Sequence, residues 1–180
     1  ISNVPRDIQR SKLIALYLGN NSLGKFPPDI TQVRSLQYLC MDGNGLLAVP
    51  NDIGALDRLK FLTLHNNRWI QAIPRSISNV MSLEYLDVRN NSIATLPDAI
   101  TQLPQLKYIY LDNNPICLNG WMSAAKNVDF VARLDDLPGK GGLCLPQCSP
   151  YCTTSFLKSE KTCVRECNSK ACKFQNGLCS

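Results

Sequence analysis

The sequence contains no apolar run approaching the roughly 18 residues that a helix needs to cross a bilayer. Its only histidine is His65, and it has no Cys-x-x-Cys pair, so the usual zinc-site spacings are missing. It also lacks a basic stripe interleaved with aromatic residues, which many nucleic-acid-binding surfaces show. We therefore expect no membrane insertion of this segment, no zinc site and no nucleic-acid partner.

Charge is sparse and unevenly distributed. The 180 residues carry a net charge of +5, from 19 Lys and Arg against 14 Asp and Glu. Residues 139–180 hold six Lys or Arg and two Glu, which gives +4 and leaves +1 for residues 1–138. Because 44% of the residues are apolar, the nearly neutral part of the chain can fill a core.

A skeleton of Leu and Ile returns five times in the first 116 residues, at intervals of 23, 23, 24 and 23. The copies begin at Leu13, Leu36, Leu59, Leu83 and Leu106. Each follows L-x-x-L-x-L-x-x-N-x-L, which is the leucine-rich-repeat pattern. The resemblance implies an α/β solenoid, a right-handed superhelix with a parallel sheet on its concave face and short helical or 3₁₀ segments on its convex face.

A second constant block follows each of the first four Asn residues of the skeleton. An apolar residue and a proline, as in Phe26-Pro27 and Ile73-Pro74, precede an isoleucine such as Ile30 or Ile77 by three residues. Proline suits the first turn of a helix, and apolar residues three apart bury one side of it. This block predicts the short 3₁₀ segments of the convex side.

The Asn column is predicted to be structural. A buried amide can satisfy backbone groups in the turns above and below it. We therefore expect five core amides: Asn21, Asn44, Asn67, Asn91 and Asn114.

One residue is inserted in the third copy, between Asn67 and Ile73. The insertion predicts a bulge on the ascending or convex side of that repeat. We expect Trp69 to stay in the core; a protruding Trp69 would instead be a contact site.

The chain opens inside a repeat, because Ile1, Val4-Pro5 and Ile8 match Leu23, Phe26-Pro27 and Ile30 in spacing. We expect residues 1–114 to form a partial repeat (1–12) and five copies, with further repeats upstream in a longer chain. Residues 115–147 are expected to cap the other end, with an amphipathic helix over residues 123–134. There Asn-Pro-x-Cys followed by Trp resembles the C-terminal flanking region of extracellular leucine-rich-repeat proteins, with a Cys117–Cys144 bridge as the clamp.

Residues 148–180 hold six of the nine cysteines. Such a density with few large apolar residues calls for crosslinks and an oxidising compartment. The spacing, with Asn168 and Phe174, resembles the Lin-12/Notch repeat (LNR). That resemblance implies the bridges Cys148–Cys172, Cys152–Cys167 and Cys163–Cys179. It also implies calcium, but Gln175 and Asn176 stand where the family has acidic ligands, so no cofactor is expected. A generic six-cysteine knot is the alternative.

The outward strand positions should form the interaction face of the solenoid. Aromatic rings recur there, and rings at strand spacing provide binding anchors. The predicted contact residues are Tyr17, Tyr38, Phe61, His65, Tyr85, Asp87, Arg89, Tyr108 and Tyr110. The rings could equally pack on one another without a partner, and the charges of neighbouring strands could simply stabilise one another.

Two further features bear on chemistry. Cys40 is expected to be a free thiol on the open face, and pairing it with His65 as a base would give a thiol enzyme, the least favoured reading. The sequons at Asn20 and Asn90 predict N-glycosylation at one rim of the concave face.

The sequence thus predicts a non-catalytic, extracellular protein-interaction module that belongs to a larger secreted or membrane-anchored protein. Two alternatives remain. The chain could be a building block of an extracellular coat, filament or matrix, or the repeats alone could belong to an intracellular scaffold.

Overall fold

A computed structural model of the chain describes residues 1–117. The predicted helix over residues 123–134, the module over residues 148–180 and all the predicted disulfide bridges lie outside the described residues, apart from the backbone of Cys117. Within the described part, no helix is long and apolar enough to cross a membrane.

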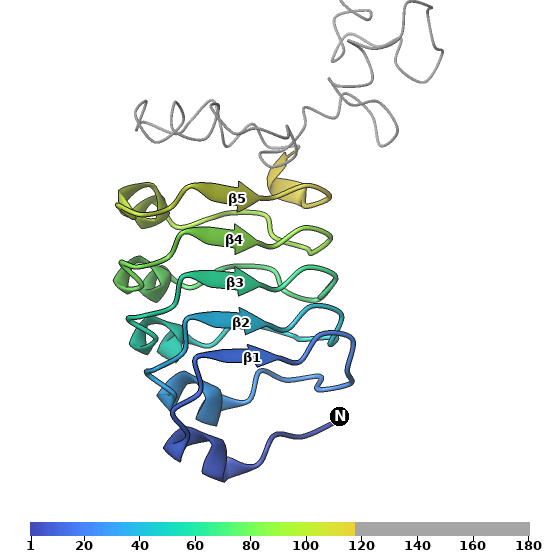
Figure 1. The fold of residues 1–180 in the computed structure, drawn as a ribbon. Coiled ribbons are helices and arrows are strands. Elements are labelled where there is room, and N and C mark those ends of the chain that lie inside the picture. The colour runs from blue at the N-terminus through green and yellow to red at the C-terminus, as the bar shows by residue number, and fades with distance from the viewer. Residues whose placement is uncertain (118–180) are drawn as a thin grey trace, which may run out of the picture.

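Five three-residue strands alternate with short 3₁₀ segments (η) along the chain (Figure 1). The strands are β1 Ala15–Tyr17, β2 Tyr38–Cys40, β3 Phe61–Thr63, β4 Tyr85–Asp87 and β5 Tyr108–Tyr110. The 3₁₀ segments are η1 Arg6–Arg10, η2 Pro28–Gln32, η3 Asn51–Ala55, η4 Arg75–Asn79, η5 Asp98–Gln102 and η6 Pro115–Cys117.

The strands form one parallel sheet in the order β1-β2-β3-β4-β5, and each strand pairs with the next copy of itself. Tyr38 lies opposite Phe61, which lies opposite Tyr85, which lies opposite Tyr108. The register thus follows the sequence repeat even across the 24-residue interval. The predicted fold, a leucine-rich-repeat solenoid with a parallel sheet and short 3₁₀ turns, is confirmed.

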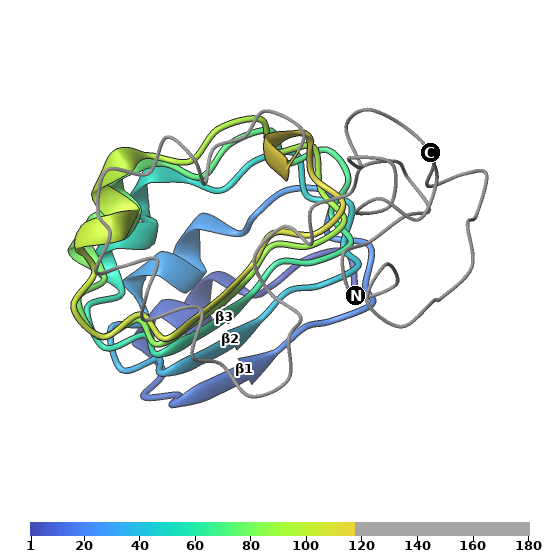
Figure 2. The ribbon, with the colours of Figure 1, turned by 90° about the horizontal axis from the view of Figure 1, so that it is seen from above.

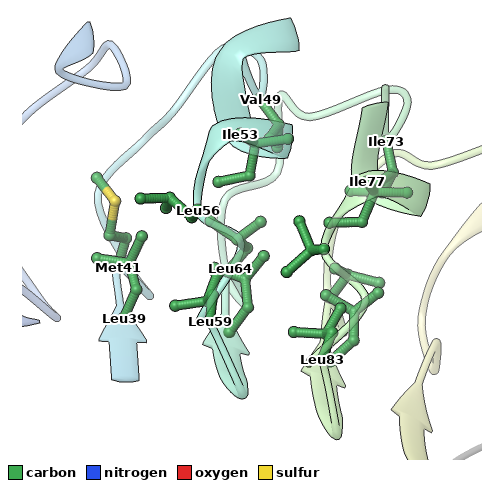
Figure 3. Packing of buried hydrophobic residues seen from close by; sticks show 14 of the residues in the cluster. Leu39, Met41, Val49, Ile53, Leu56, Leu59, Leu64, Ile73, Ile77 and Leu83 are labelled. Carbon is green, nitrogen blue, oxygen red and sulfur yellow. The ribbon is translucent and has the colours of Figure 1, made fainter. Parts of the chain in front are cut away.

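The core fills the space between the strands and the 3₁₀ segments, which Figure 2 shows on opposite sides of the molecule. Side chains from both sides point into this space in Figure 3, with Leu39, Leu59 and Leu83 coming from one side and Ile53 and Ile77 from the other. All five of these side chains are fully buried. Prolines such as Pro50 and Pro74 immediately precede the 3₁₀ segments, where their fixed φ suits the first turn.

The Asn ladder is buried in four of its five members. Asn67 donates to the carbonyls of Met41 (2.9 Å) and Leu64 (2.9 Å), while its Oδ1 accepts from the N–H groups of Asn44 and Leu46 (3.0 Å each). The prediction of a core position is wrong for Asn21, which is only half-buried. Its Oδ1 accepts from the exposed amino terminus of Ile1 at 2.6 Å.

The prediction that Trp69 stays in the core is also wrong. Trp69 is 53% exposed, and Ile70 takes the core position with no exposed surface. The chain turns at residues 68 and 69, where the N–H of Ile70 donates to the carbonyl of Asn67 (2.9 Å). The inserted residue is therefore expelled outward, and Ile70 keeps the spacing of three residues to the buried Ile73.

A column of left-handed residues was not anticipated from the sequence. The residue before each ladder Asn has a positive φ between 55° and 60° in all five copies. These residues are Asn20, Gly43, Asn66, Asn90 and Asn113. Only glycine, and to a lesser degree Asn or Asp, adopts this conformation readily. The signal was present, because all five positions hold Asn or Gly.

Candidate functional site

The outward side chains of the sheet lie in two columns along the strands. The first column crosses the strands through Tyr38, Phe61, Tyr85 and Tyr108. The second column crosses them through Tyr17, Cys40, Thr63, Asp87 and Tyr110. A third column follows just beyond the strand ends, with Asp42, His65, Arg89 and Asp112. The structure thus brings the predicted contact residues together on one face, while their role in binding stays a prediction.

The aromatic rings of β2 to β5 form a continuous strip. The centroids of Phe61 and Tyr85 are 4.0 Å apart with nearly parallel planes (12°). Tyr38 continues the strip on one side at 6.2 Å from Phe61, and Tyr108 and Tyr110 continue it on the other at 6.0 and 5.1 Å from Tyr85. The three tilted pairs lie within the roughly 4.5–7 Å range of favourable aromatic pairs, and the stacked Phe61–Tyr85 pair is closer still. The rings pack on one another, as the alternative reading expected.

The strip nevertheless remains accessible. Tyr38 is 39% exposed, and Tyr17, in the second column on β1, is 69% exposed. Burial raises the pKa of Tyr85 to about 12, with a smaller contribution from the negative charge of Asp87. The middle of the strip is therefore tightly packed, whereas Tyr38 at its β2 end, and Tyr17 on the neighbouring β1, offer free ring surface.

Asp87 differs from the expectation of an exposed contact residue, because its side chain is only 2% exposed. Arg89 covers it, with Nε 3.0 Å from Oδ1 and Nη2 2.6 Å from Oδ2. This hydrogen-bonded pair raises the pKa of Arg89. The guanidinium carbon also lies 5.0 Å from the centroid of Tyr110. Arg89, 40% exposed, is thus the group of the pair that a ligand can reach.

His65 lies between two carboxylates. Its Nε2 is 3.8 Å from Asp42, and its Nδ1 is 3.5 Å from Asp87. Asp42 also accepts a hydrogen bond from the Thr63 hydroxyl at 3.3 Å. Side chains of adjacent strands thus approach one another as expected, and the attraction between His65 and the two carboxylates is ionic when the imidazole is protonated. Among the described residues, no three His, Cys, Asp or Glu side chains converge as a metal site requires.

Cys40 is a free, half-buried thiol in the second column. Burial raises the pKa of its thiol, and the hydrogen bond with Thr63 only partly offsets this effect. A nucleophilic cysteine needs the opposite shift, because the thiolate is the reactive form. The raised pKa of the Cys40 thiol therefore does not favour the thiol-enzyme reading.

The two sequon asparagines are both exposed members of the left-handed column. Asn90 belongs to a surface ladder, since its amide donates to Asn66 at 2.8 Å and accepts from Asn113 at 2.6 Å. Asn20 instead faces Gly43, and its side-chain Oδ1 occupies the space where a Cβ at position 43 would lie. The two sequons thus have different surroundings, and glycosylation stays a prediction at both.

The fold and its open face are those of a leucine-rich-repeat solenoid, the class of repeat proteins whose sheet carries a variable outward surface. In agreement with this class, residues 57–116 match the leucine rich repeat family.

Relatives and solved structures point to the same class. The disease resistance-like protein DSC1 of Arabidopsis thaliana is 34% identical over 71 residues, which is 39% of this chain and 6% of that protein. The LRR protein LIC12759 of Leptospira interrogans has a TM-score of 0.57 and 29% identity, covering 72% of this chain and 39% of that structure. The LRR ectodomain of the Arabidopsis receptor kinase HAESA, solved with an IDA peptide hormone ligand, has a TM-score of 0.56 and 32% identity.

The HAESA match covers 62% of this chain and 20% of the ectodomain. The chain therefore spans well under two thirds of each of these three proteins. It is similar to part of a receptor ectodomain that binds a peptide ligand.

Proposed function

We propose that this chain is a protein-interaction module whose concave face binds an extended segment of a partner protein or peptide, within a larger secreted or membrane-anchored protein. The aromatic strip from Tyr38 to Tyr110 carries the proposal. Aromatic side chains supply large contact area with little loss of conformational freedom, and they are common binding anchors.

The arrangement of polar groups beside the strip supports the same function. Asp42 and Arg89 line one edge of it and are held by hydrogen bonds with Thr63 and Asp87, so they can bind a ligand without first being ordered. His65 lies in the same column, close to Asp42. Preorganised polar groups beside an apolar surface add specificity at a low entropic cost. The similarity to the HAESA ectodomain agrees with a peptide ligand for this chain.

The test is selection of a displayed random peptide library on the full chain, followed by affinity measurements on concave-face variants. Tyr38→Ser combined with Tyr110→Ser should weaken the selected peptides by about 10-fold or more. Arg75→Ser, an exposed change on η4 on the opposite side, is the matched control and should have no effect. Peptides that bind the double variant as tightly as the wild type would refute concave-face binding.

The same preparation tests the structural alternative. A receptor-like module should sediment as a monomer, whereas a building block of a coat or filament should assemble in a concentration-dependent manner. Ordered assembly without peptide binding would favour the structural role.

A further inference from the structure

Trp69 is an additional residue that the repeat pattern does not require. The interval from the buried Ile70 to Ile73 is three residues, as it is from Leu46 to Val49. Without Trp69 the third copy would read Asn-x-Ile with the same spacing as its neighbours. The insertion therefore adds a tryptophan to a repeat whose core is complete without it.

The Asn ladder has an unpartnered side-chain oxygen at two of its buried members, Asn44 and Asn91. Oδ1 of Asn114 accepts from the N–H of Ile93 at 2.9 Å, and Oδ1 of Asn67 accepts from two N–H groups. Oδ1 of the buried Asn91, whose place in the ladder faces the turn at residues 67–70, has no hydrogen-bond partner among the described residues. The same holds for Oδ1 of the buried Asn44, which faces a turn without an inserted residue. A buried acceptor without a partner costs free energy. Because Asn44 lacks the same bond without any insertion, the ladder does not account for the outward Trp69.

The outward Trp69 ring borders a hollow on one flank of the solenoid. This flank is formed by the stretches that follow the ladder Asn residues and lead toward the 3₁₀ segments. Trp69 (53% exposed) and Leu47 (55% exposed) line a hollow of about 570 Å³ together with Val49, Asn51, Gln71 and Pro74. The volume lies within the roughly 300–1,000 Å³ typical of ligand pockets. The Ser92 hydroxyl donates to the carbonyl of Arg68 at 2.6 Å and so fixes the turn that presents the ring.

The four stretches of this flank that follow the ladder Asn residues carry only positive charge, and the nearest acidic residue in sequence to the hollow is Asp52, which follows Asn51. The guanidinium carbon of Arg68 lies 5.1 Å from the centroid of the Trp69 ring. Arg68 is exposed and forms no ion pair with any described carboxylate. The flank stretches 22–25, 45–48, 68–72 and 92–95 contain Lys25 and Arg68 but no Asp or Glu. An occupant with a negative charge complements this surface, whereas the basic residues 139–180 of the chain itself do not.

We propose that the flank around Trp69 is a second interaction surface, separate from the concave face, which takes a partner-protein segment with a bulky apolar side chain beside an acidic one. The apolar side chain fills the hollow between Leu47 and Trp69. The carboxylate pairs with Arg68, whose position over the ring keeps the guanidinium at the edge of the hollow.

A displayed random nonapeptide library, first depleted on the full chain lacking Trp69 and then selected on the wild type, tests this proposal. We expect peptides in which Asp or Glu lies next to a large apolar residue. Trp69→Ala should weaken a synthesised representative by about 10-fold or more. Met81→Ala, a matched control at 55% exposure outside the hollow, should leave its affinity unchanged.

Two further variants separate the possible outcomes. Arg68→Glu should weaken acidic peptides and strengthen the same peptides with Lys in place of the acid. Deletion of Trp69 should abolish binding without lowering the melting temperature. Selected peptides without acidic residues, equal binding to the Trp69→Ala variant, or no enriched peptides at all would overturn the proposal. The Tyr38→Ser, Tyr110→Ser variant should bind the flank peptides normally, so the two surfaces can fail independently.

Discussion

The most informative perturbation of the scaffold is Asn67→Ala. It removes the acceptor of two buried N–H groups, those of Asn44 and Leu46, and the donor to the carbonyl of Met41. At about 1 to 1.5 kcal/mol for each stranded N–H group, the free energy of unfolding should fall by about 3 kcal/mol. For a chain of this size, such a loss lowers the melting temperature by about 10 °C.

The ladder itself provides the comparison. Asn91 uses only its donors, to the carbonyls of Leu64 and Val88, so Asn91→Ala should cost less, about 1 to 2 kcal/mol. Asn21 is half-buried and water can replace its bonds, so Asn21→Ala should cost less than about 1 kcal/mol. The exposed Asn51→Ala is a control, expected within about 0.5 kcal/mol of the wild type.

Urea denaturation of the four variants, followed by circular dichroism, measures these differences. The expected order of destabilisation is Asn67, Asn91, Asn21, Asn51. An Asn91 loss equal to or larger than that of Asn67 would refute the inference that the unpartnered Oδ1 of Asn91 adds nothing to stability. A loss at Asn67 no greater than that at Asn51 would refute the burial argument for the whole column.

Three further predictions concern single groups. Because burial raises the pKa of the Cys40 thiol, a thiol reagent should modify Cys40 more slowly than free cysteine at pH 7, and the rate should increase as the pH rises. A rate above that of free cysteine, which is lost in Cys40→Ser, would contradict this prediction. Because the pKa of Tyr85 is about 12 when folded and ordinarily about 10 when unfolded, its contribution to stability should be complete below pH 10 and lost as the pH rises toward 12. Alkaline denaturation of Tyr85→Phe, which lacks this loss, measures it. In a secretory host, glycosylation should be more complete at Asn20 than at Asn90, whose amide is held by Asn66, and glycopeptide mass spectrometry would show the reverse if this were wrong.

Most of the fold could be predicted from the sequence because each repeat has the same spacing of apolar residues and Asn. Leu39, Leu62 and Leu86 occupy equivalent core positions, and one copy suffices to place the others. The prediction failed at the inserted residue, where Trp69 and Ile70 are both apolar. Counting forward from Asn67 selects the Trp, whereas counting back from Ile73-Pro74 selects the Ile. The spacing to the following 3₁₀ segment proved decisive.

The candidate site was only partly predictable. Strand periodicity identifies the outward residues, but it does not reveal which of them cover one another. Asp87 was expected at the surface, and it is buried because Arg89, two residues further on, folds back over it. His65 approaches both Asp42 and Asp87 across neighbouring strands, a contact that depends on side-chain conformation rather than on spacing.

The left-handed column has a consequence for how this protein can change. A branched or bulky side chain would strain the backbone at the positions of Asn20, Gly43, Asn66, Asn90 and Asn113. Few other residue types are therefore tolerated at these five positions. The outward strand positions carry no such restriction. The positions that constrain the backbone are therefore interleaved with exposed outward positions such as Tyr17 and Tyr38, where a substitution changes the surface without straining the turns.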